Sequence, residues 1–166
     1  EEILDLFRAA SPDEAFVENF ESASLKNMKQ GFYTIWKIER EFAQEIEFTP
    51  RQQSAAQHLE HIMPKKPGAE WGEVSSDERF SNSLSRIGNL LILRSEINQS
   101  IKNRSISFKI KNDSALDYSH SEMKLAREVV DKFDEWAVDG VWTFESIRRR
   151  QVYLARHYAA RVWALD

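Results

Sequence analysis

The chain has 166 residues, of which 42% are hydrophobic, 11% aromatic and 30% charged, and its formal net charge is −4; these proportions exclude a disordered or fibrous protein. It contains no cysteine, which excludes disulfides and thiolate zinc sites, and its strongest apolar run, Leu90 to Leu93, is too short to cross a bilayer. We therefore expect a protein that does not enter a membrane. The lack of cysteine leaves the redox compartment open, and the location that we expect is the cytoplasm. The net acidity argues against a general polyanion binder.

The first 56 residues are predicted to form helices. The segment Ser11–Glu14 has the capping side chain, the first-turn proline and the acids that begin a helix. Apolar residues then recur at helical spacing as far as Met28. After Gly31 a second stripe predicts a helix over Phe32–Phe42, and the capping-box pattern of Thr49–Gln52 predicts a short third helix.

Residues 57–112 change to a pattern of strands and loops. His58–Met63 reads as a short strand closed by a proline, and a long loop follows with one helical turn over Asp77–Leu84. Gly88–Leu93 is the strongest strand of the sequence, and Ser95 begins a helix directly after it. The predicted order is strand, loop, strand, helix.

Residues 113–166 are predicted to be helical again. One apolar stripe runs from Met123 to Trp136, and Thr143 caps a final helix that extends to Val162. The predicted fold class is therefore mainly α, with a small unit of two strands and a helix embedded among helices.

Two clusters in the middle segment carry the side chains of a reactive site. Glu60-His61 places a carboxylate beside an imidazole, the minimum that can hold a hard divalent ion and take a proton from water at neutral pH. Gly88-Asn89 precedes the second strand, and Asn98 lies nine residues after Asn89. A carboxamide on the following helix can supply a second oxygen ligand, and such sparse ligation suits magnesium, which keeps several waters and binds substrate phosphate.

These residues resemble a known family. His58–Pro64, Ile87–Leu93, Asn98 and Phe108-Lys109 look like the HNH (ββα-metal, His-Me finger) nuclease domain at the C-terminus of GmrSD-type modification-dependent restriction endonucleases. The spacing from Asn89 to Asn98 is also similar to that of the HNH domain in RNA-guided CRISPR nucleases. The close resemblance covers about residues 57–109, and Trp142–Arg150 is a weaker match.

The resemblance implies a role for each motif residue. Glu60 and Asn98 correspond to the ligands of one Mg²⁺ or Mn²⁺ ion, His61 to the general base that activates water, and Asn89 to the residue that steadies the histidine. Among the bases in the acid-free stretch from residue 97 to 112, we expect Lys102 and Lys109 to contact phosphate.

The resemblance also implies an activity and partners. Family members cut DNA, and an N-terminal NTPase-like sensor domain, on the same or a partner chain, recognises the modification. Because the sequence starts with Glu1 rather than Met, we expect residues 1–166 to be one HNH nuclease domain, with N-terminal helices (1–56), a ββα-metal core (57–112) and C-terminal helices (113–166), cut from a longer protein. A single site cuts one strand, so nicking is the expected activity, and double-strand cleavage needs a homodimer or two successive events.

Several alternatives stay open at this point. Neighbours on a regular strand point to opposite faces, so Glu60 and His61 share a site only where the strand ends or twists. His58 could act as a further ligand, but a structural role is favoured, and Arg148–Arg150 reads as a solvated face rather than a DNA contact. Family members often have glutamine where this chain has Lys65. The rival functions are a catalytically silent module that binds DNA or a partner, and a nonspecific toxin-like nuclease.

Overall fold

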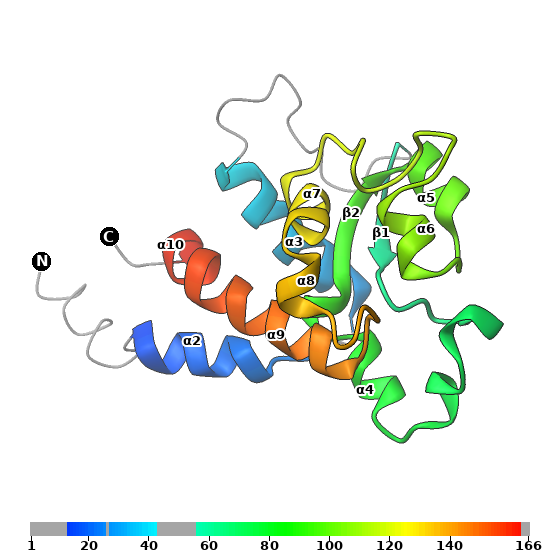
Figure 1. The fold of residues 1–166 in the computed structure, drawn as a ribbon. Helices are drawn as coiled ribbons and strands as arrows, with labels where there is room; N and C mark the ends of the chain where they lie inside the picture. The colour runs from blue at the N-terminus through cyan, green and yellow to red at the C-terminus, as the bar shows by residue number, and fades with distance from the viewer. Residues whose placement is uncertain (1–12, 26, 43–55, 164–166) are drawn as a thin grey trace, which may run out of the picture.

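A computed structural model of the chain describes residues 13–25, 27–42 and 56–163 (Figure 1). The helical turn expected at Thr49–Gln52 lies outside these residues. Among them, no helix is long and apolar enough to cross a membrane. In chain order the helices and strands are α2 (Asp13–Ser22), α3 (Met28–Phe42), β1 (Gln57–His61), α4 (Phe80–Leu84), β2 (Leu90–Arg94), α5 (Ser95–Ile101), α6 (Ile106–Ile110), α7 (Lys124–Asp131), α8 (Phe133–Trp136), α9 (Phe144–Leu154) and α10 (Ala160–Trp163). Short 3-10 turns precede α4 and β2, and a π-helical turn, Ala155–Ala159, joins α9 to α10.

The two strands form an antiparallel pair inside a mainly helical molecule, which confirms the predicted fold class. Their register pairs Gln57 with Arg94 at one end and His61 with Leu90 at the other. Figure 1 shows α5 and α6 on one side of the strands and α3, α7 and α9 on the other. The polypeptide enters α5 directly from β2, so β1, β2 and α5 form the expected strand, strand and helix unit.

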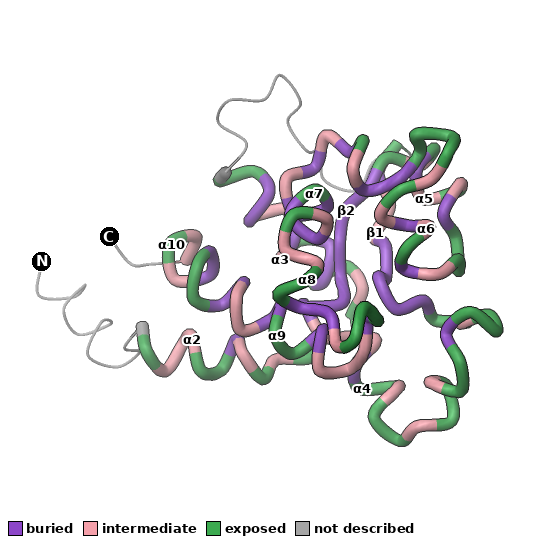
Figure 2. Tube along the Cα trace, viewed as in Figure 1, coloured by how far each residue is buried: buried purple, intermediate pink, exposed green. Residues whose placement is uncertain are grey.

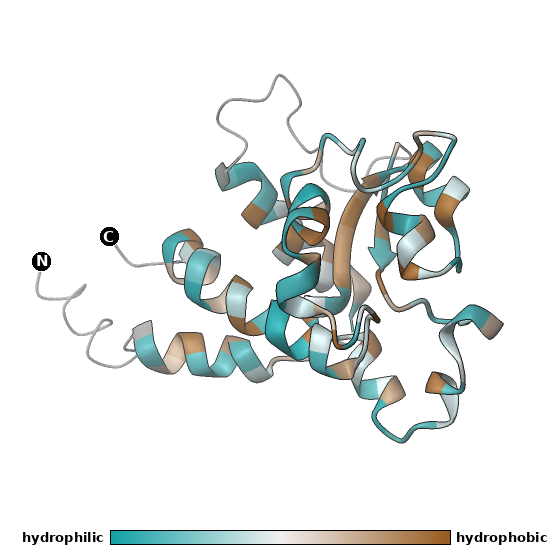
Figure 3. Cartoon of the chain, viewed as in Figure 1, coloured by the Kyte–Doolittle hydropathy of each residue, from teal (hydrophilic) through white to brown (hydrophobic). Residues whose placement is uncertain are grey.

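β2 is the centre of the hydrophobic core. Leu90, Leu91, Ile92 and Leu93 are each 0% exposed, and Figures 2 and 3 show a buried, hydrophobic strand. Because helices cover both of its faces, β2 has no polar alternation, which explains the apolar run that made it the strongest predicted strand.

α3 begins earlier than the sequence predicted. It starts at Met28 and continues through Gly31, where we expected a break. A Cβ at Gly31 would lie 2.9 Å from Leu90 Cδ1, so the glycine allows α3 to approach β2 closely rather than ending the helix.

Two further boundaries depend on side chains. β1 ends at His61, two residues before the predicted end, because the next backbone groups bond to Asn89 instead of a strand. Thr143 caps α9 as predicted: its hydroxyl accepts from the amide of Ser146 and the Ser146 hydroxyl accepts from the amide of Thr143. α6 was not predicted, and the Ser105 hydroxyl caps it by accepting from the amide of Phe108.

Candidate active site

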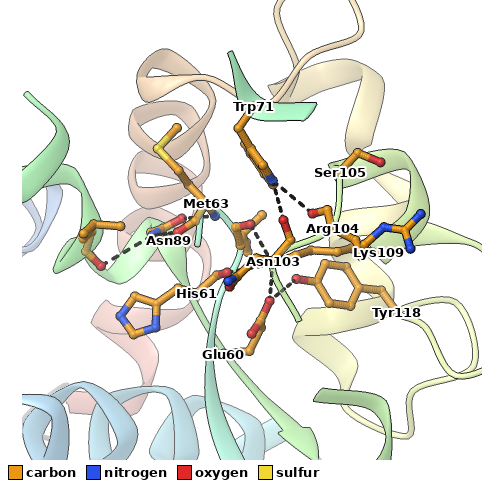
Figure 4. A network of polar contacts seen from close by, with 12 residues as sticks. Glu60, His61, Met63, Trp71, Asn89, Asn103, Arg104, Ser105, Lys109 and Tyr118 are labelled. Carbon is orange, nitrogen blue, oxygen red and sulfur yellow. Dashed lines mark hydrogen bonds and ion pairs between the residues drawn. The ribbon is translucent and has the colours of Figure 1, made fainter. Parts of the chain in front are cut away.

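The backbone that follows β1 is held by two buried side chains that reach it from separate parts of the chain (Figure 4). The amide of Met63 donates to Asn89 Oδ1 (2.8 Å), Asn89 Nδ2 donates to the Met63 carbonyl (3.1 Å), and the amide of Ile62 donates to the Asn89 carbonyl (2.9 Å). Lys109 Nζ donates to the carbonyls of His61 and Ile62, both at 3.0 Å. The segment that presents His61 is therefore fixed on both sides.

Glu60 takes part in a buried ion pair. Its Oε1 accepts from Lys109 Nζ at 2.5 Å and from the Tyr118 hydroxyl at 3.1 Å. Both Lys109 and Tyr118 are 0% exposed. Burial raises the pKa of Glu60 and lowers the pKa of Lys109, and the attraction between the two charges opposes both shifts.

His61 lies on the other side of the strand. Figure 4 shows its imidazole and the Glu60 carboxylate pointing to opposite sides of β1, as the pleat requires for neighbours. Burial, reinforced by the charges of Lys65 and Lys109, lowers the pKa of His61 to about 4. The ring is therefore neutral at pH 7, and its buried Nε2 has no hydrogen-bond partner among the described residues.

A cavity of about 370 Å³ opens at this end of β1. Its walls include the three predicted site residues Glu60, His61 and Lys102, and they also include Lys65 and Asn103. The remaining lining residues are Met28, Leu59 and Pro64. The lining of this His61 cavity includes a histidine whose ring is neutral and two lysines, residues that can accept a proton and attract a phosphate.

Lys102 sits in a strained turn at the edge of the His61 cavity. It follows α5 with φ 40° and ψ −125°, and the amide of Arg104 donates to the Ile101 carbonyl (3.0 Å). These values match the first central position of a type II′ turn, which favours glycine. A lysine held in this conformation beside a polar cavity is typical of a functional position.

Two predicted site residues are placed differently from the others. Asn98 lies half-buried on α5, and it does not line the His61 cavity. We expected Lys109 to contact phosphate, but it is fully buried and bonded to Glu60, His61 and Ile62. Its ammonium has three donors, and all three are used within the protein.

The hydrogen bonds of the Asn89 side chain go to the backbone of Met63 and, more weakly, to the Leu84 carbonyl, and not to the His61 ring. It thereby fixes the chain two residues beyond the histidine. Asn89 itself is 0% exposed, in the turn before β2.

α9 holds that turn through residues that the sequence analysis did not assign to the site. Arg150 Nη1 donates to the carbonyls of Gly88 (2.9 Å) and Leu90 (3.0 Å), and the amide of Gly88 donates to Gln151 Oε1 (3.3 Å). Burial lowers the pKa of Arg150 to about 10, so it stays charged. Its place in the weaker match after Trp142 was the one signal that could have identified it.

The prediction of a solvated face holds for the two arginines before Arg150 but not for Arg150 itself. Arg148 and Arg149 are exposed and pair with Glu145. Arg150 is 0% exposed. One more helical step of about 100° turns this third side chain into the core.

The residues present could hold a hard cation only if substrate phosphate supplied some of its oxygen ligands. No group of three or more His, Cys, Asp or Glu residues that could hold a metal occurs in the described ranges. Glu60 offers one carboxylate, and its Oε1 already binds Lys109 and Tyr118. These donors fit a magnesium or manganese ion whose remaining ligands are a carboxamide oxygen, water and phosphate oxygens. They do not fit a site in which protein side chains supply every ligand.

Comparison with known protein families gives a match over most of the chain. Residues 10–157 match the family model described as the C-terminal domain of GmrSD restriction endonucleases. No curated protein and no solved structure matches the chain. The match covers every residue that lines the His61 cavity, together with Asn89, Lys109 and Arg150.

Proposed function

Because the chain belongs to the GmrSD restriction endonuclease C-terminal domains, a family of HNH-type nuclease domains, we propose that it hydrolyses phosphodiester bonds of DNA with the help of one divalent metal ion. Family membership implies a nuclease role in a restriction system, DNA as the substrate and an N-terminal partner domain.

The observation that carries the proposal is the placement of His61 in the wall of a cavity that Lys65 and Lys102 also line. A general base must be neutral at the working pH and within reach of water. The lowered pKa of His61 keeps its ring neutral, and the ring lines an open cavity beside two lysines. Since Nε2 is enclosed, Nδ1 is the nitrogen that we propose to accept the proton of the attacking water.

The other residues bind and orient. Lys65 and Lys102 would attract the phosphate into the His61 cavity, and Asn89 would keep the His61 segment in place. Glu60 and Asn98 are the residues that would hold the ion. When bound, Mg²⁺ or Mn²⁺ supplies Lewis-acid polarisation of the scissile phosphate and stabilises the leaving oxygen.

One site of this kind cuts one strand. We propose that a double-strand break comes from two successive nicks or from a homodimer, and that an NTPase-like sensor domain on the same or a partner chain directs the cut. The predicted cytoplasmic location agrees with a restriction role, because the DNA to be cut is in the cell.

A second candidate is a catalytically silent module that binds DNA or a partner. It is favoured by one observation: Glu60 is paired with Lys109 on the side of β1 opposite to His61. The Glu60–Lys109 ion pair would also stabilise the fold of a domain that has lost its catalytic activity.

Supercoiled plasmid separates these candidates. We expect the chain to convert it to nicked circles with Mg²⁺ or Mn²⁺, and we expect EDTA or Glu60→Gln to abolish the conversion. No cleavage of modified or unmodified DNA, with either ion, would support the silent module. Equal cleavage of a structured RNA in a parallel reaction would support a toxin-like nuclease instead of a DNA-restricting one.

A further inference from the structure

We propose that Lys109 is a positioning residue of this centre, which fixes the candidate metal ligand and the candidate general base in one arrangement. Its ammonium bonds at the same time to the Glu60 carboxylate and to the carbonyls of His61 and Ile62. The inference rests on the proposed nuclease function, and it gives Lys109 a role different from the phosphate contact that its charge suggested.

The hydrogen-bond count supports this role. An ammonium group has three donors, and Lys109 Nζ has three acceptors at 2.5, 3.0 and 3.0 Å. The residue is 0% exposed. No donor remains for DNA, so any effect of Lys109 on cleavage must pass through Glu60 and the His61 backbone.

Lys109 is itself anchored from several directions. Its amide donates to the Ser105 carbonyl (3.0 Å), and its carbonyl accepts from the amide of Tyr118 (2.8 Å). Its ammonium lies 5.8 Å from the centre of the Trp71 ring, and Trp71 Nε1 donates to the carbonyls of Asn103 and Arg104, each at 3.0 Å. The ammonium is therefore a fixed point rather than a mobile charge.

The same anchor orients the carboxylate. Lys109 and Tyr118 both bond to Oε1 of Glu60, so the other oxygen, Oε2, is the one left to face a cation. Lys109 also binds the carbonyls of His61 and Ile62. It therefore couples the orientation of the Glu60 carboxylate to the position of the His61 backbone. Misplacement of a reacting group by about 1 Å can cost about 100-fold in rate.

The absence of cysteine from the sequence allows a direct test at this one residue. Lys109→Cys would be alkylated in urea with 2-bromoethylamine, which rebuilds a lysine-length ammonium, or with iodoacetamide, which adds a neutral group. Both products would then be refolded and checked by circular dichroism. Single-turnover and steady-state cleavage of DNA with saturating Mn²⁺ would be measured for each.

We expect the aminoethylated protein to recover kcat to within about tenfold of wild type and the neutral adduct to stay about 100-fold below it, while KM for DNA changes by less than about threefold in both. With kcat expressed per folded protein, as measured by circular dichroism, a merely structural lysine would leave both kcat and KM of the neutral adduct near the wild-type values. A folded neutral adduct with the kcat of the aminoethylated protein would overturn the proposal.

Two further measurements cover adducts that do not refold. Tyr118→Phe keeps the ion pair and removes one contact to Oε1, so it should lower kcat by about three- to tenfold at unchanged KM. Unchanged kcat in this variant would count against positioning at Oε1. Lys109→Met should also shift the amide resonances of Ile62 and Met63, which share peptide groups with the two carbonyls that Lys109 binds. Unshifted resonances would overturn the proposal even if the wild-type chain cut no DNA. Failure of the wild-type chain to cut DNA would refute the nuclease function alone.

Discussion

The side chains of neighbouring residues on a strand point to opposite sides. Glu60 and His61 therefore lie in two different environments, one on each side of β1. Glu60 turns toward Lys109 and Tyr118 and stays paired. His61 turns away, loses water by burial and remains neutral. The acid and the base are thus kept from bonding to each other, which leaves each of them available for a different partner.

Lys102 gives a prediction at this scale, because its backbone is strained. Strain of this kind costs about 1–3 kcal/mol, so Lys102→Gly should raise the free energy of unfolding by about 1 kcal/mol in urea denaturation. The same substitution removes a positive charge from the His61 cavity, so it should weaken DNA binding. The slope of the logarithm of the binding constant against the logarithm of the salt concentration should fall by about one, the effect of one lost phosphate contact.

Lys102→Ala is the matched control. It removes the same charge but keeps a Cβ, so we expect the same loss of DNA binding with no gain in stability. A gain for Ala equal to the gain for Gly would show that the backbone at residue 102 is not strained.

α9 packs closely against the turn before β2. A Cβ on Gly88 would lie 2.1 Å from the Ile147 carbonyl oxygen and 3.0 Å from the Gln151 amide nitrogen. Because both are backbone atoms, α9 would have to move. Gly88→Ala should therefore lower the free energy of unfolding by about 3 kcal/mol or more.

Gly68→Ala is the control for this comparison. Gly68 has extended backbone (φ −81°, ψ −179°), and a Cβ added there would meet nothing within 4 Å. The effect of this alanine on the free energy of unfolding should stay within about 0.5 kcal/mol. Similar losses for the two alanines would contradict the close approach of α9.

Glu39 connects α3 to α7 and makes stability depend on pH. It is 2% exposed, and its carboxylate accepts from the amides of Lys124 (3.0 Å) and Leu125 (2.8 Å) at the start of α7. Burial raises the pKa of Glu39 to about 7, against an ordinary value of 4.5. The folded chain therefore holds a proton that the unfolded chain releases between these two values.

The stability linked to this proton is complete below pH 4.5 and is lost as pH rises through about 7; it amounts to about 3 kcal/mol. The difference in free energy of unfolding between wild type and Glu39→Gln, measured in urea from pH 5 to 8, should fall with pH by an amount of this order. A flat difference for Glu39→Gln would contradict the raised pKa.

Local patterns predicted the elements well, because they depend on neighbouring residues. The spacing of apolar residues located both strands, α5 and the long helices, and Thr143 was predicted to cap the last helix, where the structure has it at the start of α9. The break expected at Gly31 was wrong, because its glycine serves contact with Leu90, which is 59 residues away.

The polar core could not be predicted in the same way. Lys109 lies in a stretch of bases without acids, and its partner Glu60 comes 49 residues earlier. Arg150 reaches carbonyls some 60 residues away. Single-sequence patterns do not contain such pairings, so buried cations were read as exposed ones. Glu60, His61 and Lys102 meet at one cavity, and the meeting of Asn98 with Glu60 at an ion stays a prediction.

At the scale of the whole molecule, the strands lie inside the helices and the His61 cavity opens where β1 ends. Residues from opposite ends of the described chain support this point: Gln151 Nε2 donates to the carbonyls of Phe20 and Ala23, both at 2.8 Å, while its Oε1 accepts from Gly88. The site is therefore supported by α2 and α9 as well as by the strand, strand and helix unit.

The net charge of −4 leads to a prediction for the molecule as a whole. With few basic residues around the cavity, the isolated chain should bind unmodified duplex DNA weakly, and binding should weaken further between about 50 and 200 mM salt. Fluorescence anisotropy with a labelled duplex measures both. Tight binding that resists salt would contradict the view that another domain supplies the targeting.

The most direct test of the central claim is the single-turnover rate of plasmid nicking with saturating Mn²⁺ for His61→Ala beside His58→Ala. Both histidines lie on β1, but only His61 lines the cavity. The account predicts a loss of about 100-fold or more for His61→Ala, a rate close to wild type for His58→Ala, and intact folds by circular dichroism for both. Wild-type nicking by a folded His61→Ala protein would contradict it.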